Sequence, residues 1–407
     1  MSDKILAVNA GSSSLKFKMF LMPEEEELFS GAADRIGGPG AGEFSYKPTG
    51  GEKVKLELDM PDHSVAVDKL LEVLVSSGAI ASLDEIKAVG HRVVQGGEYF
   101  KESVPATEAH IAVVEQLAPL APLHNPANIL GVRSFQKALP EASQSLIFDT
   151  VFHQTMPEIN YIFPIDRKYY TENKVRRYGA HGTSHDYVSG ESARLLGKDR
   201  NSSNVIVAHL GNGASITEIV DGKSVDTSMG FTPTGGLVMG TRSGDMDPTV
   251  VTYLQKVENA DGDKLSDIVT KKSGLLALSG FSNDMRDVEE AANDANHEHH
   301  AESRVAWDLF VKKVANFITL YAADIIAQGK KVDAIAFTAG IGENSTTVRK
   351  AVIDRLACLG VKINNQANET RGTVDITGEG STSKVYVIPT EEELMISRDA
   401  YKILKNS

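Results

Sequence analysis

The stretch Ile5-Leu-Ala-Val-Asn-Ala-Gly-Ser-Ser-Ser-Leu-Lys16 decides the fold of this chain. It opens with a compact apolar run, and beyond its glycine the apolar residues Leu15, Phe17 and Met19 alternate with polar ones. That pattern predicts a strand, a glycine turn at residues 11–14 and a second strand, joined as a hairpin. Because glycine has no Cβ, such a turn lets several backbone N–H groups converge on one anion.

The same pattern returns in the second half of the chain. The apolar residues 205–208 lead into Gly211-Asn-Gly213, and residues 215–220 form the next expected strand. Asp221-Gly222 then indicates another turn before a third strand at residues 223–227. Two copies of one supersecondary unit indicate a duplicated domain with a cleft between its halves.

A third polar glycine turn, Gly340-Ile-Gly-Glu-Asn-Ser345, is expected after the apolar strand at residues 332–338. One such turn alone is weak support for a phosphate site. Three of them, with the permanently charged Arg92 and Arg242, indicate a protein that binds nucleotide phosphates and transfers phosphoryl groups. Neither a Walker-type loop nor a Gly-x-Gly-x-x-Gly loop occurs, so neither of those nucleotide-binding folds is supported.

Strands alternate with helices along the chain, so the fold class is α/β. A chain of 407 residues is expected to form two or three domains. The glycine-rich residues 37–42 are expected to form a connecting surface loop. The other periodic segments predict helices at residues 65–76, 107–117, 126–139, 187–196, 248–256, 303–328, 346–359 and 391–404, and strands at residues 145–149 and 384–388.

Composition limits the classes of partner and the location. The net charge of -13 argues against nucleic acid or an anionic membrane as the main partner, because both require basic surfaces. The N-terminus has no signal-peptide core, and no apolar run approaches the ~20 residues that cross a bilayer, so a cytoplasmic location is expected. Cys358, the single cysteine, lies in an apolar-periodic segment, which favours a buried structural thiol over a nucleophile.

Two further groups of residues carry little weight. His297-Glu-His-His300 has the side chains of a metal site, but its segment is polar and acidic, so a solvated loop is expected. Ser184 and His185 are neighbours in sequence, whereas hydrolytic triads are assembled in space, so their adjacency does not indicate hydrolysis.

Motifs that run in order across nearly the whole chain resemble those of the acetate kinase family. They are Asn9-Ala-Gly-Ser-Ser-Ser-Leu-Lys16, Gly90-His-Arg-Val-Val-Gln-Gly-Gly97, Phe148-Asp-Thr-Val-Phe-His-Gln-Thr-Met-Pro157, His181-Gly-Thr-Ser-His185, His209-Leu-Gly-Asn-Gly-Ala-Ser215, Asp226-Thr-Ser-Met-Gly-Phe-Thr-Pro233, Gly240-Thr-Arg-Ser-Gly-Asp245 and Thr338-Ala-Gly-Ile-Gly-Glu-Asn-Ser345.

This resemblance implies the duplicated two-domain actin/Hsp70/sugar-kinase architecture, which is ribonuclease H-like, with the active site in the interdomain cleft. Residues 1–150 and 394–407 would form the N-terminal domain and residues 151–393 the nucleotide-binding domain. The implied reaction is acetate + ATP ⇌ acetyl phosphate + ADP with Mg²⁺, or alternatively Mn²⁺, in a homodimer.

The resemblance also assigns catalytic roles. Arg92 and Arg242 match the family's arginines, and a planar guanidinium suits the charge on a transferring phosphoryl group. His181 would donate to the phosphoryl oxygens or stabilise the transition state. Asp149 and Glu392 are candidates for organising Mg²⁺, because hard oxygen ligands suit that ion.

Substrate and nucleotide positions follow from the same motifs. Arg92 would pair with the acetate carboxylate, Asn9 would lie near the substrate and the metal, and Val94, Leu123 and Pro233 match the small pocket for the methyl group. Lys16 is either a nucleotide contact or an edge-strand charge. The remaining nucleotide-binding residues would be His209, Leu210, Gly211, Asn212, Gly213, Asp284, Met285, Arg286, Gly340, Ile341, Gly342, Glu343 and Asn344.

Three positions depart from the family pattern. Ala180 stands where phenylalanine is common, which removes a large wall near the substrate. Glu391 adds a charge beside Glu392 that could alter Mg²⁺ affinity, and Thr234-Gly235 replaces a bulkier pair. The alternatives are therefore a kinase for propionate or another short-chain carboxylate, a nucleotide-driven conformational switch, and a hydrolase of acyl phosphates.

Overall fold

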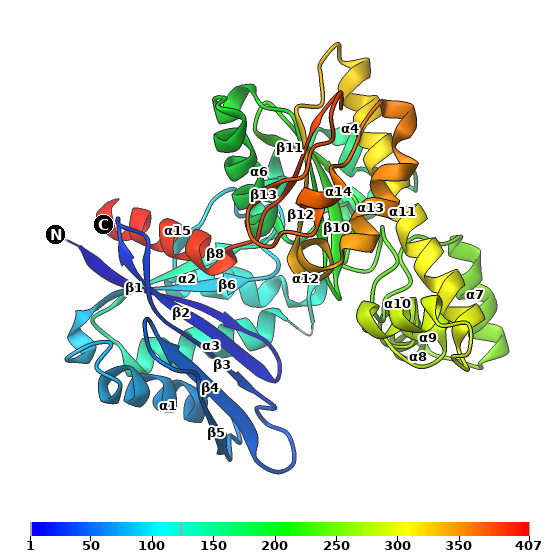
Figure 1. The fold of residues 1–407 in the computed structure, drawn as a ribbon. Helices are drawn as coiled ribbons and strands as arrows, with labels where there is room; N and C mark the ends of the chain where they lie inside the picture. The colour runs from blue at the N-terminus through cyan, green and yellow to red at the C-terminus, as the bar shows by residue number, and fades with distance from the viewer. Residues whose placement is uncertain (1, 123, 407) are drawn as a thin grey trace. The chain divides into compact units, whose positions relative to one another are not determined.

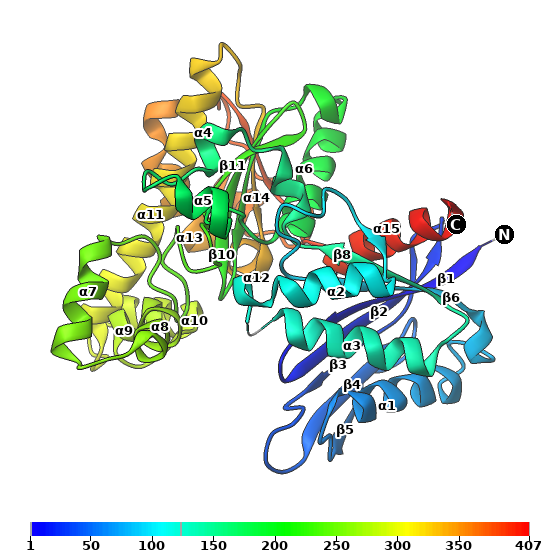
Figure 2. The ribbon, with the colours of Figure 1, turned by 180° about the vertical axis from the view of Figure 1, so that it is seen from behind.

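The computed structural model describes residues 2–122 and 124–406, which form two compact units (Figures 1 and 2). The first unit consists of the N-terminal segment up to Val151 and the C-terminal segment that begins at Glu391. The second unit is the continuous segment Phe152–Thr390. The C-terminal segment thus joins the first unit slightly before residue 394, the expected position.

The first unit is built on one sheet with the strand order β5-β4-β3-β2-β1-β6-β8-β7. The predicted hairpin is present: β1 and β2 pair antiparallel, with Asn9 opposite Lys16. β6 and β8 continue the sheet in parallel to β1, so their carboxyl ends lie at one edge. The strands are β1 (Asp3–Ala10), β2 (Ser14–Met22), β3 (Glu26–Asp34), β4 (Gly42–Pro48), β5 (Val54–Leu58), β6 (Ile86–Val93), β7 (Val104–Pro105) and β8 (Ser143–Phe148).

Helices cover both faces of this sheet because successive strand residues point to opposite sides. Leu6 and Val8 face a core completed by α1 and α3, whereas Ala7 packs with Ile396 of α15 (Figure 1). Gly90 lets α15 approach closely, since a Cβ there would lie 2.7 Å from the side chain of Ile396. The helices are α1 (His63–Ser76), α2 (Glu108–Gln116), α3 (Asn125–Ala138) and α15 (Glu392–Asn406).

The second unit repeats this arrangement with the strand order β11-β10-β9-β12-β14-β13. β9, β10 and β11 form an antiparallel meander, and β12 and β14 extend it in parallel to β9. The duplication predicted from the two glycine turns is therefore confirmed. The strands are β9 (Val205–Leu210), β10 (Ala214–Val220), β11 (Lys223–Thr227), β12 (Ala334–Thr338), β13 (Val374–Asp375) and β14 (Lys384–Val387).

The second sheet is also covered on both faces. Val188 of α6 packs against Val205 and Val207, whereas Phe310 of α11 belongs to the large core on the opposite face, with Ile206 (Figure 2). The helices are α4 (Glu158–Tyr161), α5 (Lys168–Asn173), α6 (Gly182–Leu196), α7 (Pro248–Val257), α8 (Gly262–Lys271), α9 (Gly274–Ser279), α10 (Met285–Asn293), α11 (His300–Ala327), α12 (Ala339–Asn344), α13 (Thr346–Arg355) and α14 (Asn365–Asn368).

Two predictions about local structure are wrong. The third glycine turn is instead the short helix α12, whose first residue, Ala339, has a left-handed conformation (φ 64°). The Glu343 carboxylate stabilises this helix by accepting from the Ala339 N–H at 2.8 Å. Cys358 is exposed, because α13 ends at Arg355 and the following 3₁₀ turn carries residue 358 away from the buried row.

The predicted helices and strands are otherwise present, although α6 begins at Gly182 rather than near residue 187. Strands β3 to β5 and helices α8 to α10 were not predicted. His297 and its neighbours form a turn, as expected, and His299 stacks on Phe281 with a centroid separation of 4.9 Å. In residues 2–122 and 124–406, no helix has the length and apolar character that crossing a membrane would require.

Candidate active site

In the first unit, the carboxyl ends of three neighbouring strands bring together Asn9, Arg92 and Asp149. Arg92 lies near the end of β6, and its Nη2 lies 2.8 Å from Asp149 Oδ2 just beyond β8. Its Nη1 lies 3.4 Å from Asn9 Oδ1 at the end of β1. Asp149 is fully buried, so this ion pair fixes the guanidinium in place.

The charges around Arg92 are strongly coupled. Burial alone would lower the pKa of Arg92, but the carboxylates of Asp149 and Glu392 together raise it. Burial, followed by the nearby charge of Asp149, raises the pKa of Glu392 to about 7, although Arg92 opposes that shift. The cluster therefore combines one permanent cation with carboxylates whose negative charge it partly compensates.

One donor of Arg92 remains available. Within the described residues, its buried Nε–H has no hydrogen-bond acceptor. A buried N–H without an acceptor is costly, and an oxygen of a small anion would satisfy it. The site thus fits a carboxylate or phosphate group.

Val94, two residues beyond Arg92, is held by a buried amide. Asn128 of α3 accepts from the Val94 N–H at 3.1 Å and donates to the carbonyl of Ala10 at 2.6 Å. One side chain therefore connects the segment after β6 with the β1–β2 turn. Leu123 lies outside the described residues, so its predicted place beside Val94 stays a prediction.

Two outlying charges of the first unit, Lys16 and Glu391, have different surroundings. Lys16 is exposed on β2, opposite Asn9. Glu391, the added charge, lies 2.7 Å from Lys18 Nζ, which is also 3.2 Å from Glu27. Although burial would lower the pKa of Lys18, the hydrogen bond and charge of Glu391 raise it. The extra carboxylate is thus compensated locally.

In the second unit, the β9–β10 turn brings together Gly213, Arg242 and His181. A Cβ built on Gly213 would lie 3.4 Å from Arg242 Nη1 and 3.5 Å from His181 Nε2, so both side-chain nitrogens lie beside the Gly213 backbone. Arg242 Nη1 also donates to the carbonyl of Pro233 at 3.1 Å, and burial lowers the pKa of the guanidinium. A cation and an imidazole nitrogen beside backbone without a Cβ form a cradle for an anion.

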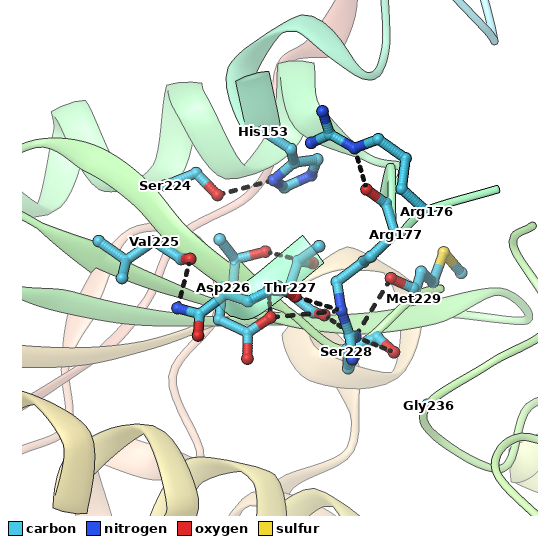
Figure 3. A network of polar contacts seen from close by, with 12 residues as sticks. His153, Arg176, Arg177, Ser224, Val225, Asp226, Thr227, Ser228, Met229 and Gly236 are labelled. Atoms are coloured by element: carbon cyan, nitrogen blue, oxygen red, sulfur yellow. Dashed lines mark hydrogen bonds and ion pairs between the residues drawn. The ribbon is translucent and has the colours of Figure 1, made fainter. Parts of the chain in front are cut away.

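The segment that leads into His181 is anchored by residues at and beyond β11 (Figure 3). Arg177 Nη1 donates to the carbonyls of Thr227 and Ser228, and its Nε lies 3.5 Å from Asp226 Oδ1. Burial raises the pKa of Asp226 to about 6, although Arg177 opposes the shift. The motif that starts at Asp226 therefore has a structural role in placing His181.

His153 connects the last residue before His181 with Ser224, and Figure 3 shows the Ser224 contact. Its Nε2–H donates to the carbonyl of Ala180 at 3.0 Å, and its Nδ1 lies 2.8 Å from Ser224 Oγ. The Ala180 side chain is buried in the core on the α11 side of the second sheet. A larger residue at position 180 would have to fit into or displace that packing.

A second imidazole supports the first. The rings of His181 and His209 are stacked, with centroids 4.0 Å apart. Ser184 Oγ lies 2.8 Å from His209 Nδ1 and receives a hydrogen bond from the Thr390 hydroxyl at 2.8 Å. These hydrogen bonds hold the ring of His209 in place, and the ring of His181 stacks on it.

The second unit also contains a pocket of about 990 Å³, at the upper end of the range for small-molecule sites. Predicted nucleotide-binding residues form much of its wall: Gly211, Asn212, Asp284, Met285, Arg286, Gly340, Ile341 and Asn344. Asp284 and Arg286 form an ion pair with each other at 2.5 Å. Further lining residues that the sequence did not reveal are Asn283, Glu289, Glu290, Asn293, Ser345, Thr346 and Arg371.

Other predicted nucleotide-binding residues do not line this pocket. Leu210 is part of the core. Gly342 packs against β9, since an ideal Cβ built on it would lie 3.6 Å from the carbonyl oxygen of Ala208. The Glu343 carboxylate accepts from the backbone of Ala339 and of Thr390. These residues support the wall instead of forming it.

A divalent metal would find few protein ligands here. No group of three or more His, Cys, Asp or Glu side chains within residues 2–122 and 124–406 could hold an ion. Asn9 and Glu392 together offer one amide and one carboxylate, which suits Mg²⁺ because that ion retains waters and substrate phosphates. The donor set therefore fits a metal that is bound mainly through the substrate.

Comparisons with known proteins identify the family and the fold. The sequence profile of the Acetokinase family matches residues 4–398. An acetate kinase of Oceanobacillus iheyensis is 47% identical over 402 residues, which cover 98% of this chain and 98% of that protein. The crystal structure of Porphyromonas gingivalis acetate kinase matches with a TM-score of 0.91 at 43% identity and covers 99% of this chain and 100% of its own. The crystal structure of a propionate kinase from Francisella tularensis matches with a TM-score of 0.91 at 39% identity and covers 98% of this chain and 100% of its own.

The duplicated sheet and these matches define a phosphotransferase of actin-like architecture, which uses ATP and a divalent metal ion and has a carboxyl group as acceptor. The chain belongs to the acetokinase family.

Proposed function

We propose that this protein transfers the γ-phosphoryl group of ATP reversibly to acetate, giving acetyl phosphate and ADP by direct in-line transfer. One observation carries the proposal: Arg242 Nη1 and His181 Nε2 both lie beside Gly213 in the β9–β10 turn. Phosphoryl transfer depends mainly on alignment and on compensation of charge at the equatorial oxygens. A guanidinium and an imidazole that meet over a glycine turn supply both.

In the second unit, Arg242 stabilises the charge of the transferring group and His181 donates a hydrogen bond to its oxygens. The large pocket lined by Asn212, Asp284 and Ile341 binds the adenosine end of the nucleotide. Its wall is polar on the Asp284 side, and it borders Gly211 at the start of the phosphate turn, which supports this assignment.

In the first unit, Arg92 pairs with the acetate carboxylate through its available Nε–H, and Asp149 keeps the guanidinium in position. Val94, which is buried, contacts the methyl group; Leu123 and Pro233 are assigned to that group from their motif positions alone. Lys16, which is exposed, is retained as a nucleotide contact.

Mg²⁺ is the proposed metal, with Mn²⁺ as a substitute, and Asn9 and Glu392 are its proposed protein ligands. When bound, the metal neutralises phosphate charge during transfer. Arg92 donates a hydrogen bond to Asn9. Burial and neighbouring carboxylates disfavour the negative charge of Glu392, so a bound cation would stabilise that charge.

The test is ATP-dependent acyl phosphate formation, trapped with hydroxylamine, with formate, acetate, propionate and butyrate in parallel. We expect the highest kcat/KM with acetate, and propionate to be poorer by roughly 10- to 200-fold, the range that one methylene provides. A maximum at propionate would keep the reaction class and assign the chain the specificity of the alternative. ATP hydrolysis without any acyl phosphate would refute the proposal.

We further propose that the enzyme acts in the cytoplasm, where ATP is available, and as a homodimer, as the family resemblance implies. Light scattering on the purified protein gives the oligomeric state directly. A monomeric mass at micromolar concentration would remove the dimer from the proposal without affecting the reaction.

A further inference from the structure

Ser215 occupies a position that no assigned role explains. It lies near the start of β10, opposite His209 in the β9–β10 ladder, and is fully buried. Its hydroxyl lies 2.9 Å from His181 Nδ1 and 2.7 Å from His185 Nε2. One side chain therefore connects the imidazole that faces the anion cradle with a second, buried imidazole.

Helix α6 places both histidines on this hydroxyl. His181 is the residue before the helix, with a left-handed backbone (φ 57°), and the His185 N–H donates to its carbonyl at 2.9 Å. Residues four apart lie on one helix face, so both rings point toward β10.

The hydroxyl has a single proton, so it can donate to only one of the two rings. If Ser215 donates to His181 Nδ1, that ring carries its proton on Nε2, and His185 Nε2–H donates to Ser215. If Ser215 instead donates to His185, then His181 must use Nδ1–H, and a neutral His181 presents a bare lone pair at Nε2. The hydroxyl thus couples the tautomers of the two histidines.

The surroundings of His181 Nε2 decide between these arrangements. This nitrogen and Arg242 Nη1 lie beside Gly213, where the proposed function puts phosphoryl oxygens. A donor at Nε2 suits oxygens that carry negative charge, whereas a lone pair would repel them.

We propose that Ser215 is a positioning residue, which donates its hydroxyl proton to His181 Nδ1 and thereby presents His181 to the phosphoryl group as an Nε2–H donor. The inference rests on the proposed function for the role of His181. The hydroxyl itself does not touch the substrate.

The experiment combines NMR with kinetics on the full-length protein. Two-bond ¹H–¹⁵N spectra of the histidine-labelled chain, assigned with His181→Gln, report which ring nitrogen carries the proton. We expect the Nε2–H form in the wild type and loss of that preference in Ser215→Ala. The same variant should lose roughly 10- to 100-fold in kcat, the range for one hydrogen bond near charge, with KM for ATP and acetate nearly unchanged.

Two variants serve as controls. Ser215→Thr keeps the hydroxyl and should restore both the spectrum and kcat. Ser192→Ala removes a buried hydroxyl of α6 that donates to the Val188 carbonyl at 2.7 Å, and should change neither.

Several outcomes would overturn the inference: the Nδ1–H form in the wild type, an unchanged spectrum and kcat in Ser215→Ala, or a folded Ser215→Thr without rescue. If Ser215→Ala does not fold, the wild-type spectrum still decides. Absence of acyl phosphate with a wild-type Nε2–H signal would refute the proposed reaction and leave the positioning of His181 intact.

Discussion

At position 213 a hydrogen atom stands where any other amino acid would place a carbon, and Arg242 Nη1 and His181 Nε2 lie beside that point. The distances from an ideal Cβ, 3.4 and 3.5 Å, are ordinary van der Waals contacts. A methyl group would therefore fit without disturbing the fold, but it would occupy the space beside both nitrogens.

We accordingly expect Gly213→Ala to retain its Tm within about 1 °C, which corresponds to less than about 1 kcal/mol in a chain of this size. Its kcat should fall at least about tenfold, because phosphoryl oxygens lose room beside Arg242. Steady-state kinetics and calorimetry are the measurements. Gly262→Ala is the control, since nothing lies within 4 Å of a Cβ there. Equal activity in the two variants would contradict the assignment of the cradle.

Glu218, in the interior of the second unit, is a second residue whose environment shifts its pKa and so affects the pH dependence of stability. It is fully buried, and within residues 2–122 and 124–406 neither carboxylate oxygen has a hydrogen-bond partner. Burial, reinforced by the charges of Asp324 and Asp226, raises its pKa from 4.5 to about 8. The folded state therefore binds this proton more tightly than the unfolded state does.

The sign of the pH dependence follows from that difference. Stability from the protonated Glu218 is complete below about pH 4.5 and is lost as the pH rises through about 8. We expect the free energy of unfolding, measured with urea, to fall between about pH 5 and 8 in the wild type and to fall less in Glu218→Gln, which cannot ionise. Glu298→Gln, at an exposed site, should keep the wild-type slope. Parallel slopes in all three proteins would show that Glu218 does not titrate in this range.

Among elements, α12 depends on a side chain outside itself. Arg349 of α13 is buried and donates through Nη1 to the carbonyls of Gly342 and Glu343, each at 2.9 Å. Its Nε donates to Asn368 Oδ1 at 2.7 Å. These bonds satisfy the carbonyls at the end of α12, the helix whose first turn lines the large pocket of the second unit, the proposed nucleotide site.

Replacing Arg349 with Met keeps the length of the side chain but leaves those carbonyls without donors. We expect the free energy of unfolding to fall by roughly 2–4 kcal/mol. The Kd for ATP should rise about tenfold, equivalent to about 1.4 kcal/mol, because α12 loses its fixed position. Calorimetry and titration with ATP measure the two effects.

The neighbouring Lys350→Met is the matched control for Arg349→Met. It removes only an exposed ion pair with Asp354, an interaction that contributes little to stability. If the Kd for ATP stays at the wild-type value in Arg349→Met although stability falls, ATP binding does not depend on the position of α12.

The elements also show what sequence can and cannot predict. The β1–β2 and β9–β10 hairpins were predictable because apolar alternation around a glycine turn is a local signal. β4 was not, because Gly42 and the preceding glycines suggest a loop; the strand forms because Phe44 packs in the core beside Phe17. Arg92 and Arg242 could be selected from their glycine-rich surroundings. Ser215, Asn128 and Arg349 could not, since their partners come from distant segments and leave no local pattern.

At the scale of the whole molecule, the two units differ in how the chain builds them. The second unit is one continuous segment, whereas the first needs α15 from the other end of the chain. Ile396 of α15 forms a cluster with Ala7 and Ile147 and covers one face of the first sheet. Removal of α15 would expose that face to water and leave the core of the second unit unchanged.

We expect a chain that lacks residues 391–407 to lose hydrogen-exchange protection in β1, β6 and β8, while β9, β12 and β14 stay protected. ATP should still bind, because every residue lining the pocket belongs to the second unit. A chain that ends at Leu404 is the control, since it loses little beyond the exposed ion pair between Lys405 and Asp3. Loss of protection in both sheets would show that the second unit cannot stand without the first.

The dependence of the first sheet on α15 also bears on biosynthesis. Domains usually fold in the order in which they leave the ribosome, the N-terminal one first. Here the nascent chain must present the uncovered Ala7 and Ile147 face until its last segment has been translated. The second unit, complete at Thr390, can fold earlier. The part of the protein that is made first is therefore finished last, and during that interval it is the part most in need of a chaperone.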